Sequence, residues 1–313
     1  MTRVAAVDCG TNSIRLLVAD VDPATGDFAE LDRRMRIVRL GQGVDRTGRL
    51  APEALERTFD ACREYAAVIK ELGAERIRFV ATSASRDAEN SDEFVRGVLE
   101  ILGVEPEVVT GDREAQLSFD GATKELLGAD HLEKPYLVVD IGGGSTEFVV
   151  GDDRVRAARS VDIGCVRMTE RHLVVDGAVV DPPTPDRADA IRADIAAALD
   201  LAEETVPLSS AATLVGLAGT VTTVAAIALG LEEYDSAAIH HSRVSLERVR
   251  EITGRLLAST HEERAAIGAM HPGRVDVIAA GALVLLAVME RCGAREVVVS
   301  EHDILDGIAW SAA

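Results

Sequence analysis

The sequence of 313 residues contains few cysteines and few lysines, and each shortage argues against a class of protein. Its four cysteines are scattered and form no CxxC pair, which argues against a disulfide scaffold or a cysteine-rich zinc site and indicates a reduced, cytoplasmic protein. Only three lysines occur, and the net charge is −20, which argues against general binding to nucleic acid. An anionic substrate would therefore need a local device, such as a metal ion, backbone amides or a few arginines.

Several catalytic patterns are missing as well. The seven histidines show neither an HExxH motif nor a paired-ligand spacing. No Gly-x-Ser-x-Gly motif occurs, and no cysteine lies in a nucleophilic setting. These absences argue against zinc peptidases, serine hydrolases and cysteine hydrolases.

One uncharged stretch, residues 206–231, is long enough to cross a membrane. It contains Pro207, Gly216 and Gly219, which favour a strand, a turn and a buried helix over a helix that faces lipid. Residues 3–7 run directly into the first predicted strand, so we expect neither a signal peptide nor a membrane partner.

Two stretches of the chain, residues 7–20 and 139–152, are versions of one another without a gap. Each has an apolar strand, then Asp-x-Gly, then small or polar residues with a serine, then a second apolar strand that ends in Asp. A carboxylate followed by a turn with little side chain is suited to a metal-bound phosphate. The repeat predicts two halves of one fold, each with a phosphate-handling loop.

The wider pattern of strands and helices also repeats. Three strands, a helix, a strand, a helix and a strand run twice, which predicts a duplicated α/β fold with mixed sheets. We place the domains at residues 1–120 and 121–302, with a closing helix at 303–313 that packs back on the first. The predicted strands are residues 4–8, 14–20, 28–38, 76–81, 105–109, 136–140, 146–150, 154–161, 213–217 and 296–300. The predicted helices are residues 52–72, 92–102, 113–127, 185–206, 221–229, 246–259, 281–292 and 304–312.

The second copy of the repeat carries the strongest chemical signal. Its three glycines, Gly142 to Gly144, allow successive amides to point at one anion, and Ser145 adds a hydroxyl donor. Asp140 and Glu147 flank the glycines and can both reach a hard cation, directly or through water. The alternative is a glycine-rich hairpin with a solvated glutamate. Because three glycines are costly in a simple hairpin, we favour a functional site.

The first copy is less specific by itself, because hairpins with Asp and Gly are common. Thr11, Asn12 and Ser13 offer phosphate donors where the second copy has its glycines and serine. Arg15 stands where Glu147 stands in the second copy. The two loops have therefore diverged in role.

Three further motifs each have an ordinary structural alternative. The turn at Gly219 and Thr220 would offer helix N-terminal amides to an anion, or Thr220 would simply cap a buried helix. Arg86 follows several residues with hydroxyl groups, a combination that can bind phosphate. Taken by itself, however, that motif is better explained as a surface loop. Glu114 in a first helical turn stabilises a helix whatever its function.

Taken together, the motifs resemble the exopolyphosphatase/guanosine pentaphosphate phosphatase (Ppx/GppA) family and occur in order over nearly the whole chain. The resemblance implies two ribonuclease-H-like domains of the actin/hexokinase/Hsp70 superfamily, with mixed sheets around a central cleft. The motifs that carry it are residues 8–16, 81–86, 111–115, 140–147 and 216–223.

The resemblance also implies roles for individual residues. Glu114 matches the catalytic glutamate that orients or deprotonates the attacking water. Asp140 and Glu147 match ligands of Mg²⁺ or Mn²⁺, and Asp8 is a further candidate ligand. The implied phosphate-binding residues are Thr11, Asn12, Ser13, Arg86, Gly142, Gly143, Gly144, Ser145, Gly219 and Thr220.

The implied activity is Mg²⁺-dependent hydrolysis of the terminal phosphoanhydride of inorganic polyphosphate. We expect short to medium chains, because longer relatives carry an additional helical region and this chain stops at Ala313. The nearest alternative is a guanosine pentaphosphate 5′-phosphohydrolase. A kinase of the same superfamily and a non-catalytic nucleotide sensor are more distant alternatives. A homodimer is expected by family analogy.

Overall fold

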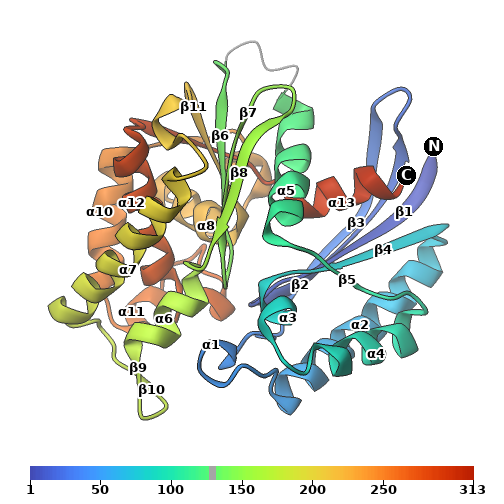
Figure 1. The fold of residues 1–313 in the computed structure, drawn as a ribbon, viewed down its shortest axis with the longest axis horizontal. Helices are drawn as coiled ribbons and strands as arrows, with labels where there is room; N and C mark the ends of the chain where they lie inside the picture. Colours follow the sequence, from blue (N-terminus) through green and yellow to red (C-terminus); the bar gives the residue numbers. More distant parts are fainter. Residues whose placement is uncertain (127–131) are drawn as a thin grey trace. The chain divides into compact units, whose positions relative to one another are not determined.

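The computed structural model describes residues 1–126 and 132–313, with no side chains described for residues 125 and 126 (Figure 1). The chain divides into two units. Unit 1 comprises Met1–Lys124 and His302–Ala313, and unit 2 comprises Glu125–Glu301. The predicted boundary at residue 120 lies inside the helix Gly111–Leu126, close to the division of the units after Lys124. Leu127, the last residue of the predicted helix 113–127, lies outside the described residues.

Unit 1 is built on a five-stranded mixed sheet in the order β3-β2-β1-β4-β5. The first three strands form an antiparallel meander, and β4 and β5 continue the sheet parallel to β1. Its strands are β1 (Thr2–Cys9), β2 (Ser13–Asp22), β3 (Asp27–Ile37), β4 (Arg76–Ala81) and β5 (Glu107–Val108). Its helices are α1 (Val44–Thr47), α2 (Pro52–Leu72), α3 (Ser83–Asp87), α4 (Ser91–Leu102), α5 (Gly111–Leu126) and α13 (Ile304–Ala312).

Strand β1 is buried on both faces because helices cover both sides of the sheet. Val7 and Cys9 belong to the core beneath α2 and α4, whereas Val4 and Ala6 belong to the core beneath α13. This alternation follows the period of two residues in a strand. It explains why the first motif strand reads as a continuous apolar run.

Unit 2 repeats the topology of unit 1. Its sheet has the order β12-β13-β11-β6-β7-β8, so β8-β7-β6-β11-β13 corresponds to β3-β2-β1-β4-β5, and β12 is an added antiparallel edge. The predicted duplicated α/β fold with mixed sheets is confirmed. Its strands are β6 (Tyr136–Ile141), β7 (Thr146–Gly151), β8 (Val155–Val161), β9 (Val174–Val175), β10 (Ala178–Val179), β11 (Thr213–Leu217), β12 (Arg243–Ser245) and β13 (Glu296–Val299). Its helices are α6 (Cys165–Leu173), α7 (Pro185–Glu203), α8 (Ala218–Leu229), α9 (Ser236–Ile239), α10 (Leu246–Ala258), α11 (His261–Ala265) and α12 (Ile278–Cys292), with 3-10 turns at Leu208–Ser210 and Pro272–Arg274.

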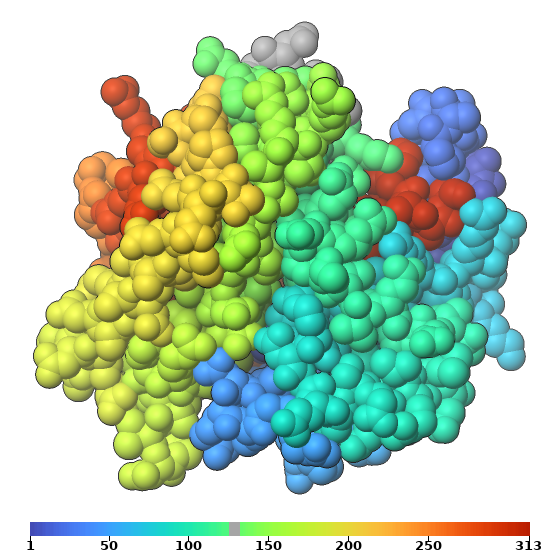
Figure 2. All heavy atoms as spheres, in the orientation of Figure 1, coloured from blue at the N-terminus to red at the C-terminus, as the bar shows by residue number. Residues whose placement is uncertain are grey.

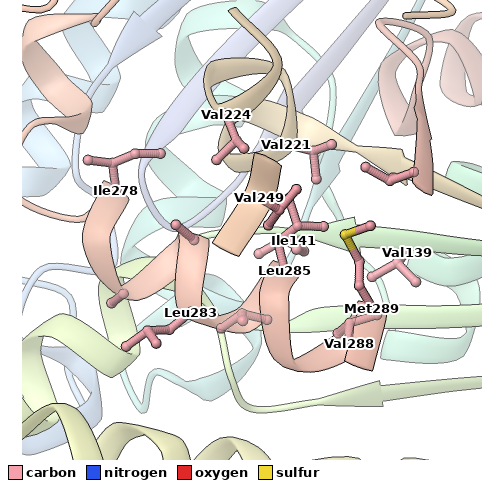
Figure 3. Close-up of a cluster of buried hydrophobic side chains, with 14 of the residues drawn as sticks. Val139, Ile141, Val221, Val224, Val249, Ile278, Leu283, Leu285, Val288 and Met289 are labelled. Carbon is pink, nitrogen blue, oxygen red and sulfur yellow. The ribbon is translucent and has the colours of Figure 1, made fainter. Parts of the chain in front are cut away.

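The core of unit 2 surrounds α12 (Figure 3). Leu285 and Met289 of this helix lie with Val139 of β6 and Val221 of α8 in one cluster of buried side chains. A helix that is apolar almost all round has to be buried, and each fully buried side chain of this size contributes about 1.5–3 kcal/mol. The uncharged stretch 206–231 forms β11 and α8 here, as predicted. Within the described residues, no helix combines the length and apolar character needed to cross a membrane.

Several short elements differ from the predictions. Residues 83–86 lie in helix α3 rather than in a loop, and α6 was not predicted. The hairpin of β9 and β10 reaches into the predicted loop 177–185. Helix α8 starts at Ala218, so Thr220 lies inside the helix and is not its cap. Short helices without side-chain caps are stabilised by tertiary packing, which leaves little local signal in the sequence.

The C-terminal helix α13 is held to unit 1 by close backbone approach. A Cβ atom added to Gly121 of α5 would lie 1.8 Å from the carbonyl oxygen of Asp303, and one on Gly307 would lie 2.0 Å from that of Leu117. Only glycine permits this crossing of α5 and α13. Gly121 and Gly307 therefore serve the packing of α5 against α13.

Ion pairs fasten the same helix. Arg33 of β3 donates to Asp306, which is fully buried, at 2.6 Å, and His302 lies 3.1 Å from the same carboxylate. Burial alone would raise the pKa of Asp306, but the hydrogen bond from His302 and the charge of Arg33 hold that pKa below its ordinary value. Asp306 also completes a capping box with Asp303 at the start of α13.

We predict that Asp306→Asn lowers the free energy of unfolding by about 2 kcal/mol at neutral pH, because the half-buried Arg33 loses its buried charged partner and keeps an ion pair with the exposed Glu30. Asparagine keeps a capping acceptor, so the charge is the main change. Since the pKa of Asp306 is lower in the folded state than in the unfolded one, the stabilisation is complete at neutral pH. It is lost as the pH falls below about 4.

Denaturant unfolding at several pH values measures this effect. Asp60→Asn is the matched control, because Asp60 is exposed and pairs with the exposed Arg63 of the same helix, α2. The control should change stability by less than about 1 kcal/mol. A gap between wild type and Asp306→Asn that persists unchanged at acidic pH would contradict the ion-pair explanation.

Candidate functional site

The two sequence repeats form the same hairpin with the same register. Asp8 pairs with Arg15 across β1 and β2, and Asp140 pairs with Glu147 across β6 and β7. Each turn is closed by the same backbone hydrogen bond, at 3.0 Å in the first hairpin and 3.1 Å in the second. The sequence repeat is therefore a structural repeat, and its members can be compared position by position.

In unit 2, the cross-strand pair consists of two carboxylates. Asp140 is 7% exposed and Glu147 is 1% exposed. Directly opposed residues of an antiparallel pair project from the same face, and like charges there repel. Ser160 of β8 donates a hydrogen bond to Glu147 Oε1 at 2.7 Å, which orients that carboxylate. The predicted metal-binding acids are thus side by side.

The glycine turn between these acids is anchored by hydrogen bonds from the N-terminus of α6. Its three glycine carbonyls all accept hydrogen bonds, and all the donors lie at the N-terminus of that helix. The bonds run from Cys165 N to Gly142 O, from Val166 N and Arg167 N to Gly143 O, and from Gly164 N and Arg167 Nε to Gly144 O, at 2.8–3.1 Å.

This anchoring decides where the turn's amides point. In a trans peptide the C=O and the following N–H point in opposite directions. The amides of Gly143, Gly144 and Ser145 therefore face away from α6, and they donate no hydrogen bond to any residue that the structure describes. Three such amides form a cradle for an anion.

Gly164 makes this arrangement possible. A Cβ atom at this position would lie 2.2 Å from the carbonyl carbon and oxygen of Gly143. Sequence reasoning missed both Gly164 and Arg167. One feature of the sequence could have indicated them: Gly164 lies shortly after the third strand of the unit and directly before an amphipathic segment.

The first turn of α8, which contains Gly219 and Thr220, packs against the N-terminus of α6. A Cβ atom added to Gly281 would lie within 3.0 Å of both Thr220 and Cys165, so these two side chains meet there. Arg274 Nη1 donates to Gly219 O at 3.1 Å, and a Cβ atom on Gly219 would clash with that guanidinium at 2.3 Å. Arg274 is a cation at this turn that sequence reasoning missed.

In unit 1, the structure brings the predicted catalytic glutamate and the predicted phosphate-binding arginine together. Arg86 of α3 donates from Nη1 to Glu114 Oε2 at 3.0 Å and to the carbonyl oxygen of Val109 at 3.0 Å. Glu114, in the first turn of α5, is 8% exposed. The arginine thereby orients a buried carboxylate at the start of the helix.

The first hairpin turn is tied to α3 as well. The hydroxyls of Thr11 and Ser83 share a hydrogen bond of 2.9 Å. The neighbouring carbonyl of Asn12 accepts from the amides of Val38 and Arg39. The hairpin turn is therefore connected to α3, the helix that also carries Arg86.

Asp8 differs from its counterpart Asp140 in having an arginine as its cross-strand neighbour. Arg15 donates from Nε and Nη2 to Asp8 Oδ2, at 3.0 and 2.7 Å, and its Nη1 donates to Asp303. Burial raises the pKa of Asp8 even though the charge of Arg15 acts in the opposite direction. Arg15 therefore joins the hairpin to the start of α13.

The site residues fall into two sets, one in each unit. Unit 1 holds Glu114, Arg86 and the Thr11–Ser13 turn, and unit 2 holds the carboxylate pair with the glycine cradle. A repeated strand order with an Asp-x-Gly hairpin in each half defines a duplicated α/β protein of the actin/hexokinase/Hsp70 fold class. Within that class, the chain belongs to the Ppx/GppA phosphatase family, whose model matches residues 17–313.

Individual relatives resemble the chain over its full length. It is 51% identical to exopolyphosphatase 2 of Mycobacterium tuberculosis, over 100% of this chain and 99% of that protein. A solved exopolyphosphatase-like protein is 46% identical, with a TM-score of 0.93 over 99% of this chain and 97% of that one. The guanosine-5′-triphosphate,3′-diphosphate pyrophosphatase of Aeromonas salmonicida is 30% identical over 98% of this chain and 58% of its own length.

We predict that Gly164→Ala lowers phosphate release about 100-fold, because a displacement of about 1 Å in a binding group can have an effect of that size. Phosphatase assays measure the rate, and circular dichroism verifies the fold. Gly254→Ala is the matched control, since nothing lies within 4 Å of a Cβ atom there. Arg167→Gln, which removes the Nε contact with Gly144 O but keeps the backbone amides of α6, should give a smaller loss. Full activity in Gly164→Ala would show that α6 does not position the turn.

Proposed function

We propose that the protein is an exopolyphosphatase that releases orthophosphate from the ends of inorganic polyphosphate in the cytoplasm, with Mg²⁺ as cofactor. The observation that carries the chemistry is the pair of buried carboxylates beside a turn whose three amides face outward. The choice of polyphosphate is supported by the 51% identity to exopolyphosphatase 2 over the full chain.

A divalent cation fits the carboxylate pair on chemical grounds. Two opposed, buried carboxylates repel when both are charged, and a hard cation relieves this while taking oxygen ligands. Among the described residues, no cluster of three or more candidate metal-binding side chains occurs. Two carboxylates are sufficient for Mg²⁺, which commonly completes its shell with water and substrate phosphates. When bound, Mg²⁺ would neutralise charge on the phosphate oxygens.

Asp8 is left out of the proposed metal site. Its carboxylate already has a protein cation, because Arg15 donates two hydrogen bonds to it. The same position in the second hairpin has an acid, Glu147, in place of the arginine. The difference favours a cation at the second hairpin alone. Mn²⁺ shares the oxygen-ligand chemistry and is a second candidate there.

Glu114 is proposed to position the attacking water and to accept its proton. The water oxygen forms a bond to the terminal phosphorus, and the bridging P–O bond breaks. The electrons of that bond go to the shortened chain, and orthophosphate is released. The hydrogen bond from Arg86 holds the carboxylate in one orientation, which general-base catalysis requires.

The remaining predicted residues would bind phosphate oxygens. The amides of Gly143, Gly144 and Ser145 donate without having to reorganise, which is the main requirement for stabilising a phosphoryl transition state. Thr11, Asn12 and Ser13, together with the Gly219–Thr220 turn, would supply further donors.

Guanosine pentaphosphate is the second candidate substrate. It is supported by the similarity to a guanosine-5′-triphosphate,3′-diphosphate pyrophosphatase, which matches 98% of this chain at 30% identity. The same groups would act on the terminal phosphate of guanosine pentaphosphate. Competition between guanosine pentaphosphate and polyphosphate decides between them. If the protein releases phosphate when no acceptor molecule is present, it is not a kinase. If it hydrolyses its ligand at all, it is not a non-catalytic nucleotide sensor. A homodimer is proposed only by family analogy.

We predict that Glu114→Gln lowers kcat for polyphosphate between about 100- and 10,000-fold, because it removes the proton acceptor. Orthophosphate release with Mg²⁺ measures the rate. The matched control is Glu105→Gln, an exposed glutamate on the loop before β5. Equal rates for wild type and Glu114→Gln would overturn the role of this residue.

We predict that EDTA abolishes turnover and that Mg²⁺ restores it. Asp140→Asn and Glu147→Gln should each raise the Mg²⁺ concentration for half-maximal rate at least about tenfold, since even loss of an outer-shell partner has an effect of this size. Asp186→Asn, at an exposed position in unit 2, is the control. Asp8→Asn should leave the Mg²⁺ requirement unchanged. A shift with Asp8→Asn like that of Glu147→Gln would return Asp8 to the metal site.

A further inference from the structure

Unit 1 contains a cavity of about 670 Å³ that no step of the proposed reaction uses. It lies between α1 and the start of α2, and its size is within the range of ligand sites. In Figure 2, this segment of the chain appears in blue at the surface in the lower part of the view. The charged residues that line it are Arg46, Arg49, Glu53 and Arg57.

The cavity is positive in a protein whose net charge is −20. The guanidinium of Arg46 makes no hydrogen bond or ion pair with any residue in the described ranges. Arg49 lies 3.7 Å from Glu89 and 3.6 Å from Glu93, and exposed pairs at such distances contribute little. Both guanidinium groups are therefore available to an anion at small cost.

The cavity adjoins the hairpin turn of unit 1. Gly41 donates its amide to the carbonyl of Thr11 at 2.9 Å, and Arg39 donates to Asn12 at 2.9 Å. The next residue, Gln42, lines the cavity and accepts a hydrogen bond from Arg57 Nη2 at 3.2 Å. A short, hydrogen-bonded segment thus connects the proposed phosphate donors with the cavity.

We propose that this cavity binds the part of a polyphosphate chain that lies beyond its reacting end, which rests on the proposed exopolyphosphatase function. Arginine forms paired hydrogen bonds with phosphate oxygens, and the acidic surface elsewhere repels such a chain. The described residues that line the cavity include no aromatic side chain that would stack on a base. The lining therefore favours a phosphate chain over a nucleoside.

The test is a series of polyphosphates of increasing length, from tripolyphosphate to long chains. The variant Arg46→Ala/Arg49→Ala should raise KM for long chains about tenfold and leave kcat unchanged. KM for tripolyphosphate, the shortest chain of the series, should change less than about twofold. Equilibrium dialysis of long-chain polyphosphate measures binding independently of turnover.

The matched control is Arg63→Ala/Arg96→Ala, which removes two exposed arginines elsewhere in the same unit. An equal effect in the control, or an equal rise in KM for tripolyphosphate, would overturn the proposal in favour of general electrostatics. So would unchanged binding of long chains by the cavity variant. If wild type fails to hydrolyse polyphosphate, the proposed function fails, and dialysis still decides whether the cavity binds the chain.

Discussion

The structure depends on the interaction between the aspartate at the end of the first strand of each hairpin and the residue opposite it on the second strand. In unit 1 the cross-strand neighbour of Asp8 is an arginine, so the charge is neutralised within the protein. In unit 2 the neighbour of Asp140 is a second acid, Glu147, and both side chains are buried. Two opposed carboxylates repel each other when both are charged, which is the basis of the cation proposed at this hairpin. The two hairpins thus differ in charge at one register position, where one has Arg15 and the other has Glu147.

The arginine of the first hairpin has a further consequence. Arg15 contacts Asp303 as well as Asp8, and Asp303 caps α13. The last helix of the chain is thereby attached to the first hairpin. In the second hairpin the corresponding support comes from a helix close in sequence, α6, whose amides hold the glycine carbonyls. The same turn is thus stabilised in two ways: by an arginine that reaches α13 in unit 1 and by the amides of α6 in unit 2.

Much of this could be predicted from the sequence because the signals are local. The bounds of α2, β4, β11 and α13 are as predicted, since proline, glycine and apolar periodicity mark their ends. The repeated Asp-x-Gly turn predicted two matching hairpins. Helices α3 and α6 escaped prediction, because each is short and has no side-chain cap.

The sequence by itself determined the duplicated order of strands and helices and the chemical types at the candidate site. These follow from residue identity and from periods of two and about 3.6 residues, which are properties of a single segment. The tertiary structure alone decided which groups meet: Arg86 with Glu114, Arg274 with Gly219, and α6 with the glycine turn. Such partners lie 28, 55 and about 20 residues apart, and no local pattern encodes a contact that folding creates.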